Sequence, residues 1–282
     1  MKQACEDAGV EALGYLPKCA DVEIPSRHLG LSLDEDFCFE EFADRVAELV
    51  EKYVDIDRLL ELTKQVAPAA LPMSVSHRTY RREPSFTVAI ARDPAFNFMY
   101  EANIRYLHHL GEVTYFSPLA DTSLPDAGFV YLPGGYPELY LAALSANRPM
   151  LQSIRRYVEN GGKLLAECGG MMYLCDEIRD KNGDVFPMVG VLHQSATMEN
   201  MKLRLGYRTL LYNDARLKGH EFHYSRLVEQ QDPLPSCAVA YTAKGVKTDT
   251  PFYRYKNVWA GYTHLYWADP AGNDWFTKFI IK

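Results

Sequence analysis

The sequence lacks the features that identify several broad classes of protein. No apolar run is long enough to span a bilayer, and the first residues show no signal-peptide pattern. Basic residues are not in excess, because 30 Lys and Arg stand against 37 Asp and Glu, which gives a net charge of −7. We therefore expect neither nucleic acid nor an anionic membrane surface as a partner.

Cysteine is scarce and scattered. The six Cys residues form no Cys-x-x-Cys pair and no spacing typical of a zinc site. We therefore expect reduced thiols, no metal site and a cytoplasmic location. Hydrophobic residues, in contrast, make up 48% of the 282 residues, which is enough for a sizeable core in one large domain or two unequal ones.

Three regions of the chain separate by pattern. Residues 1–65 show too few strand patterns for a domain of their own, although apolar residues at three- and four-residue steps from Phe42 to Val54 predict an amphipathic helix. Residues 66–84 hold three prolines and no periodicity, which predicts a linker. From residue 85 to residue 282, strand and helix patterns alternate.

This alternation predicts an α/β fold with a doubly wound, mostly parallel sheet and helices on both faces. After Gly190, short segments rich in Tyr, Val and Thr predict an antiparallel extension. The expected parallel strands are 86–91, 113–116, 129–132 and 163–167, and the expected helices are 100–110 and 150–159.

Cys168 follows the last of these strands and precedes two glycines, after which a helix is expected. In a sharp strand-to-helix turn, a side chain points away from the sheet, beside the unpaired N–H groups of the helix start. A cysteine at that place has a favoured thiolate and nearby donors for an oxyanion. The pattern indicates a nucleophile, and a buried structural cysteine in a glycine-rich turn is the alternative.

Two further segments could complete a site around Cys168. Pro133-Gly134-Gly135-Tyr136 follows the strand 129–132, and its glycines allow backbone N–H groups to approach a ligand closely. His264 follows the expected strand 258–260 and could supply the base that a thiol nucleophile needs. Taken alone, the first segment could be a plain turn, and the histidine could be a packed core residue.

The segment Gly-His-Glu-Phe-His-Tyr-Ser (219–225) holds two histidines and a glutamate. Glu221 and His223 would share one face of a strand, because side chains alternate between faces. These residue types could bind a metal of the zinc type. No cysteine or carboxylate partner is evident elsewhere in the sequence, so contact with substrate or support of the catalytic residues is the favoured role.

Four motifs follow one another in the order and spacing of a known family. They are Gly-Gly-Tyr-Pro-Glu (134–138), Ala-Glu-Cys-Gly-Gly-Met-Met-Tyr-Leu (166–174), the segment 219–225 and Tyr-Thr-His (262–264). Together they resemble the cobyrinic acid a,c-diamide synthase family, of the class I glutamine amidotransferase-like superfamily. Residues 25–31 and 92–100 also resemble it, so the resemblance spans essentially the whole chain. The form of 219–225 favours diamide synthases over the related cobyric acid synthases.

The resemblance implies a glutaminase mechanism. Cys168 would attack the side-chain amide of glutamine and form a glutamyl thioester, with His264 as the base that activates the thiol. Backbone N–H groups near Gly135 and Gly169 would stabilise the oxyanion. Supporting or substrate-contact roles are implied for Tyr136, Glu221, His223 and Asp93.

In the complete enzymes of this family, ammonia passes to an ATP- and Mg²⁺-dependent synthetase site that amidates the a- and c-acetate side chains of a corrinoid precursor. The resemblance therefore implies glutamine and a cobyrinate-type corrinoid as substrates, and it leaves a homodimer open.

The sequence departs from the family pattern at two places. Many class I amidotransferases carry a glutamate two positions after the catalytic histidine, where this chain has Tyr266. An orienting carboxylate is therefore missing or comes from elsewhere. No phosphate-cradling Gly-x-x-x-x-Gly-Lys-[Ser/Thr] loop occurs, and residues 1–65 resemble only the tail of the synthetase domain, a partial α/β remnant.

The second departure predicts an expression fragment or the product of a split gene. We expect no cofactor in this chain, with ATP and Mg²⁺ required by the synthetase domain that it lacks. Two other functions stay open on the same scaffold. One is a Cys-His hydrolase, which glutamine specificity would distinguish. The other is a binding or regulatory module with an inert thiol, which labelling of Cys168 by a glutamine-mimicking electrophile would distinguish.

Overall fold

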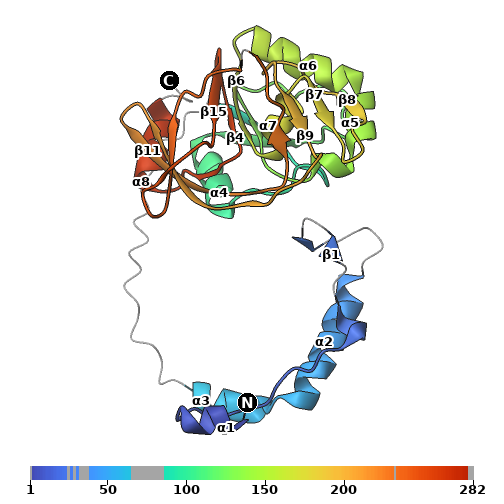
Figure 1. Ribbon diagram of the computed structural model, residues 1–282, viewed down its shortest axis with the longest axis vertical. Coiled ribbons are helices and arrows are strands. Elements are labelled where there is room, and N and C mark those ends of the chain that lie inside the picture. The colour runs from blue at the N-terminus through green and yellow to red at the C-terminus, as the bar shows by residue number, and fades with distance from the viewer. Residues whose placement is uncertain are drawn as a thin grey trace. The chain divides into compact units, whose positions relative to one another are not determined.

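The computed structural model describes residues 2–23, 26–27, 30–31, 38–64, 86–231 and 233–278 (Figure 1). The chain divides into two compact units, Met1–Arg78 and Thr79–Lys282. The expected linker at 66–84 lies outside the described residues, as do residues 25, 28 and 29 of the segment 25–31. The expected assignment of residues 1–65 to a synthetase remnant therefore stays a prediction.

The first unit consists of helices and a two-stranded ribbon. The amphipathic helix expected between Phe42 and Val54 is confirmed as α2. The next helix starts where the side chain of Asp55 accepts a hydrogen bond from the Arg58 N–H at 2.9 Å, which caps the helix. The elements are α1 (Lys2–Asp7), η1 (Ala20–Val22), β1 (Ser26–Arg27), β2 (Gly30–Leu31), α2 (Phe39–Tyr53) and α3 (Ile56–Thr63).

A six-stranded sheet forms the centre of the second unit, in the order β15-β16-β6-β5-β3-β4. All neighbouring pairs are parallel except β15 with β16, which confirms the expected mostly parallel α/β fold. The strands are β3 (Thr87–Ala91), β4 (Glu112–Phe116), β5 (Phe129–Leu132), β6 (Lys163–Glu167), β15 (Phe252–Tyr255) and β16 (Val258–Gly261).

Helices connect and cover these strands (Figure 1). Ile104 and Leu107 of one helix and Trp275 of another join a buried cluster with Val88 and Tyr131, which places both helices on one face of the sheet. The helices of this unit are α4 (Glu101–Leu110), η2 (Pro137–Leu139), α5 (Leu141–Ala146), α6 (Arg148–Glu159), α7 (Gly169–Leu174) and α8 (Pro270–Phe276). No helix among the described residues has both the length and the apolar character needed to cross a membrane.

Two smaller sheets complete the described part of the unit. The first is antiparallel throughout and confirms the extension expected after Gly190, whereas the second begins before Gly190 and pairs β7 with β9 in parallel. The first has the order β14-β13-β10-β11-β17, with strands β10 (Arg204–Tyr212), β11 (Ala215–His223), β13 (Val239–Thr242), β14 (Lys247–Thr248) and β17 (His264–Tyr266). The second has the order β12-β9-β7-β8, with strands β7 (Glu177–Arg179), β8 (Val185–Pro187), β9 (Ser195–Thr197) and β12 (Arg226–Leu227).

The chain passes from the central sheet to the first of these small sheets over a very short distance. Strand β16 ends at Gly261 and β17 begins at His264, so two residues connect the sheets. Because β16 lies beside β6 in parallel register, with Gly261 opposite Glu167, His264 is carried to the carboxyl end of β6. Ligands of parallel α/β sheets bind at this end of the strands.

Candidate active site

Cys168 stands at the sharp turn between β6 and α7, as the sequence predicts. Its backbone has φ 48° and ψ −107°, a conformation that a residue other than glycine rarely adopts. Its N–H donates to the Gly261 carbonyl oxygen at 2.8 Å, and its side chain is buried. The neighbouring strand therefore holds the strained turn in place, as expected for a nucleophile at a strand-to-helix elbow.

The surroundings of Cys168 keep its thiol protonated. Burial raises the pKa of Cys168 well above its usual range, and the Glu138 carboxyl raises it further, whereas a hydrogen bond from the Gly169 backbone lowers it. Burial also raises the pKa of Glu138 to about 7. The helix start alone therefore does not supply a thiolate here, and attack by the sulfur requires a base.

The loop after β5 contacts both the candidate base and the start of the helix that follows the thiol. A Cβ built on Gly134 would lie 2.2 Å from His264 Cε1, so the ring rests directly on that glycine. On the other side, a Cβ built on Gly169 would lie 3.2 Å from the Gly135 carbonyl oxygen and 2.7 Å from Pro137 Cδ. The loop thus contacts His264 on one side and the start of α7, the helix that follows Cys168, on the other.

A methyl group at Gly134 should displace the His264 ring. For the glutamine hydrolysis that the resemblance implies, we expect Gly134→Ala to lower turnover by about 100-fold, the order expected from a misplacement of 1 Å. The measurement is steady-state ammonia release by each purified variant. Gly128→Ala, just before the same strand, is the matched control, because a Cβ there meets nothing closer than 3.6 Å. Equal activity of the two variants would contradict the placement of the ring.

His264 is buried among aromatic side chains. Its ring meets Phe98 edge-on at a centroid distance of 4.5 Å and stacks on His220 at 5.1 Å. Burial, with contributions from His220 and His223, lowers the pKa of His264 to about 3, so the ring is neutral. His220 is its register partner on β11, a neighbour that the sequence analysis did not single out.

Glu167, the residue before Cys168, was also absent from the predicted site residues. Its side chain is buried and lies beside His264, with Oε2 4.0 Å from His264 Nδ1. Tyr131 donates a hydrogen bond to Oε2 at 2.8 Å, and the Leu265 N–H donates to Oε1 at 3.1 Å. The signal available in the sequence was a single glutamate directly after the apolar residues 164–166 of β6.

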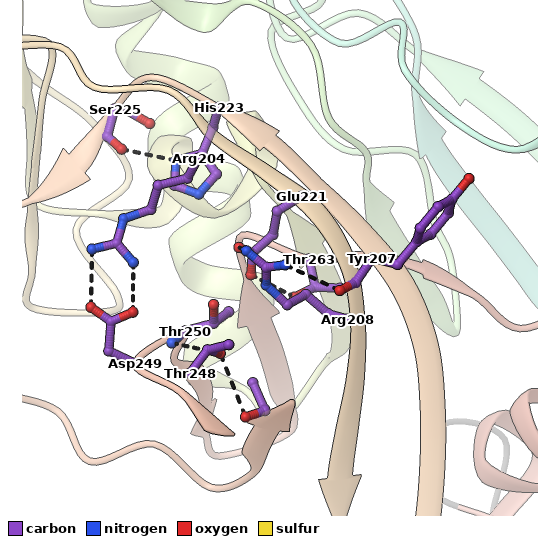
Figure 2. A network of polar contacts seen from close by, with 11 residues as sticks. Arg204, Tyr207, Arg208, Glu221, His223, Ser225, Thr248, Asp249, Thr250 and Thr263 are labelled. Atoms are coloured by element: carbon purple, nitrogen blue, oxygen red, sulfur yellow. Dashed lines mark hydrogen bonds and ion pairs between the residues drawn. The ribbon is translucent and has the colours of Figure 1, made fainter. Parts of the chain in front are cut away.

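Glu221 and His223 share the buried face of β11, as the alternation of the motif predicts. Figure 2 shows that Glu221 points to Arg208, whose Nη2 lies 2.9 Å from its Oε2, while the Thr263 hydroxyl donates to Oε1 at 3.2 Å. Gly206 stands opposite Glu221 on β10, and a Cβ there would lie 2.9 Å from Arg208 Nη1. The missing side chain makes room for the arginine.

His223 is engaged elsewhere in the same network. Its Nδ1 lies 2.8 Å from the Ser225 carbonyl oxygen (Figure 2). Its ring stacks on Tyr262 at a centroid distance of 3.8 Å. Burial lowers the pKa of His223 to about 4. Nearby, Arg204 and Asp249 form a bidentate ion pair with distances of 2.6 and 3.0 Å. Within the described ranges, no three His, Cys, Asp or Glu side chains gather as metal ligands would.

Asp93 and Tyr136 support the loop rather than the thiol directly. Asp93 Oδ1 accepts hydrogen bonds from the Ala95 and Phe96 N–H groups at 2.8 and 3.1 Å, which fixes the turn after β3. The Tyr136 N–H donates to the Ala95 carbonyl oxygen at 2.9 Å, so this turn carries the Gly134–Tyr136 loop. Burial, together with Glu138 and Cys168, raises the pKa of Tyr136.

Residues 87–272, which hold all of these features, match the family model of the CobB/CobQ-like glutamine amidotransferase domain. The chain belongs to this family. It is 36% identical to the hydrogenobyrinate a,c-diamide synthase of Pseudomonas aeruginosa, over 93% of this chain and 58% of that protein. It is 38% identical to the cobyrinate a,c-diamide synthase of Dehalococcoides mccartyi, over 93% of this chain and 59% of that protein.

This CobB/CobQ-like chain therefore spans somewhat under two thirds of the length of the curated relatives it matches. Among solved structures, PurLQS from Thermotoga maritima matches with a TM-score of 0.46 and 18% identity, over 64% of this chain and 87% of that chain.

Proposed function

We propose that this chain hydrolyses glutamine and supplies the ammonia to an ATP-dependent amidotransferase that amidates the a- and c-carboxylates of a cobyrinate-type corrinoid in cobalamin biosynthesis. The observation that carries the glutaminase part is the convergence of Cys168, His264 and the Gly134–Gly135 loop at the carboxyl end of β6. The corrinoid part rests on the diamide synthases to which the chain is similar.

In the proposed mechanism, His264 takes the proton of the Cys168 thiol while the sulfur attacks the side-chain amide carbon of glutamine. Backbone N–H groups of Gly135 and Gly169 stabilise the oxyanion of the tetrahedral intermediate. His264 then gives its proton to the leaving nitrogen, which departs as ammonia and leaves a glutamyl thioester. Water, deprotonated by the same histidine, attacks the thioester and releases glutamate and the free thiol.

ATP and Mg²⁺ do not enter these steps. The sequence has no Gly-x-x-x-x-Gly-Lys-[Ser/Thr] loop to cradle the phosphates of a nucleotide. We assign ATP and Mg²⁺ to a synthetase part of the kind expected from the resemblance. A homodimer and a cytoplasmic location stay predictions, and light scattering of the purified chain tests the first.

The test of the proposed function is mass spectrometry of the chain after incubation with 6-diazo-5-oxo-norleucine, a glutamine-mimicking electrophile, with and without excess glutamine. We expect one adduct on Cys168 and protection by glutamine. Adducts on several cysteines, or labelling that glutamine does not prevent, would contradict a glutamine pocket and favour a hydrolase or an inert module.

A further inference from the structure

The carboxyl group of Glu167 is buried beside the candidate active site, and the mechanism above does not use it. It is 1% exposed and is the last residue of β6, one residue before the nucleophile. Each of its oxygens accepts one hydrogen bond, Oε2 from the Tyr131 hydroxyl and Oε1 from the Leu265 N–H. These two donors fix the plane of the carboxyl group and lower its pKa, but burial outweighs them and raises the pKa of Glu167 to about 8.

The group that faces this carboxyl is the His264 ring. Nδ1 of His264 lies 4.0 Å from Glu167 Oε2 and has no hydrogen-bond partner within the described part of the chain, although the ring is buried. Phe98, His220 and Gly134 surround the ring and limit its rotation. Buried polar atoms normally have a hydrogen-bond partner. A proton on Nδ1 would allow this nitrogen to donate a hydrogen bond to the Glu167 carboxylate.

We propose that Glu167 is the positioning residue of the site: its carboxylate holds the proton of His264 on Nδ1, so that Nε2 carries the lone pair that removes the thiol proton. The inference rests on the proposed function for its consequence in catalysis. When His264 takes the thiol proton it becomes an imidazolium, and the ionised form of the adjacent carboxyl stabilises that charge.

The distance of 4.0 Å is longer than a hydrogen bond, so about 1 Å of approach is required. Such contacts often shorten only when substrate binds. Tyr266, at the position where many class I amidotransferases have a glutamate, does not offer an alternative, because it is 39% exposed and packs edge-on against Tyr100. Glu167 therefore supplies from β6 the carboxylate that the sequence does not provide after the histidine.

Glu167→Gln should select the wrong tautomer of His264. The new amide oxygen is needed by the Leu265 N–H, which turns the amide NH₂ toward Tyr131 and His264. An NH₂ group donates to Nδ1, and the ring proton then moves to Nε2, where it blocks proton removal from the thiol. The direct test is ¹⁵N NMR of the whole chain with labelled histidine, recorded at pH 9, above the pKa of about 8 to which burial raises Glu167.

We expect the Nδ1–H tautomer of His264 in the wild type and the Nε2–H tautomer in Glu167→Gln. Tyr131→Phe is the matched control, because it breaks the same hydrogen bond to Oε2 but keeps the carboxylate, so it should retain the Nδ1–H tautomer. An Nε2–H ring in the wild type would overturn the proposal even where Glu167→Gln fails to fold. The same His264 tautomer in Glu167→Gln and Tyr131→Phe would also overturn it, because the carboxylate would then have only a structural role.

The same variants separate this inference from the proposed function. Glu167→Gln should slow labelling of Cys168 by 6-diazo-5-oxo-norleucine by about 100-fold or more, with the protecting concentration of glutamine changed less than about threefold. Absence of labelling in the wild type would contradict the glutaminase proposal. The role of Glu167 would still be decided by the NMR experiment, which shows whether the His264 proton is on Nδ1 or on Nε2. Wild-type labelling rates in Glu167→Gln would contradict the inference alone.

Discussion

Cys168→Ala is expected to abolish glutamine hydrolysis, with a loss of turnover of about 10⁴-fold or more, while the chain stays folded. The sulfur forms the covalent intermediate, and no neighbouring group can replace it in that step. Alanine keeps the backbone N–H that donates to the Gly261 carbonyl oxygen, and it meets the same strain at φ 48° that cysteine meets. Ammonia release and the thermal unfolding midpoint, measured on the same preparation, check both halves of the expectation.

Cys175→Ala is the matched control for this experiment. Cys175 is also buried, at the other end of α7, and its thiol donates only to the Met171 carbonyl oxygen at 3.5 Å. Its removal takes a buried thiol from the same helix without touching the nucleophile, so turnover should stay near that of the wild type. Residual turnover in Cys168→Ala close to that of Cys175→Ala would place the nucleophile elsewhere.

The central fold could be predicted from the sequence because its strands are short apolar runs bounded by glycine, proline or charged residues. The strand expected at 129–132 is β5 without a change of bounds, and the one expected at 163–167 is β6. The helix expected at 150–159 starts two residues earlier, at Arg148, because the Asn147 side chain accepts a hydrogen bond from the Met150 N–H and caps it. Periodicity does not reveal such a cap.

The partners of the candidate site residues could be predicted only in part. The thiol and the histidine stand in recognisable motifs, whereas Glu138 and Glu167 enter through contacts that depend on strand register and on the path of the loop after β5. A glutamate at the end of an apolar strand can face solvent, a cation or a histidine, and a single sequence does not distinguish these cases. The pairing of Glu167 with Gly261 across β6 and β16 decides it here.

His264→Ala is expected to lower the turnover of glutamine by about 10³-fold, with little change in KM. The buried thiol of Cys168 is protonated, because burial and Glu138 raise its pKa. Its reaction therefore depends more on a base than the reaction of an exposed thiolate does. Steady-state kinetics over a range of glutamine concentrations separates the two parameters. His108→Ala, on the exposed side of α4, removes a histidine away from the site and should behave as the wild type.

Near-normal turnover in His264→Ala would move the role of base to His223. The structure argues against that outcome, because His223 Nδ1 already contacts the Ser225 carbonyl oxygen and its ring is stacked on Tyr262. Removal of the His264 ring leaves a space bounded by Gly134, Phe98 and His220. Added imidazole should occupy that space and restore part of the turnover in His264→Ala. It should not do so in Cys168→Ala, because the nucleophile rather than the base is missing there.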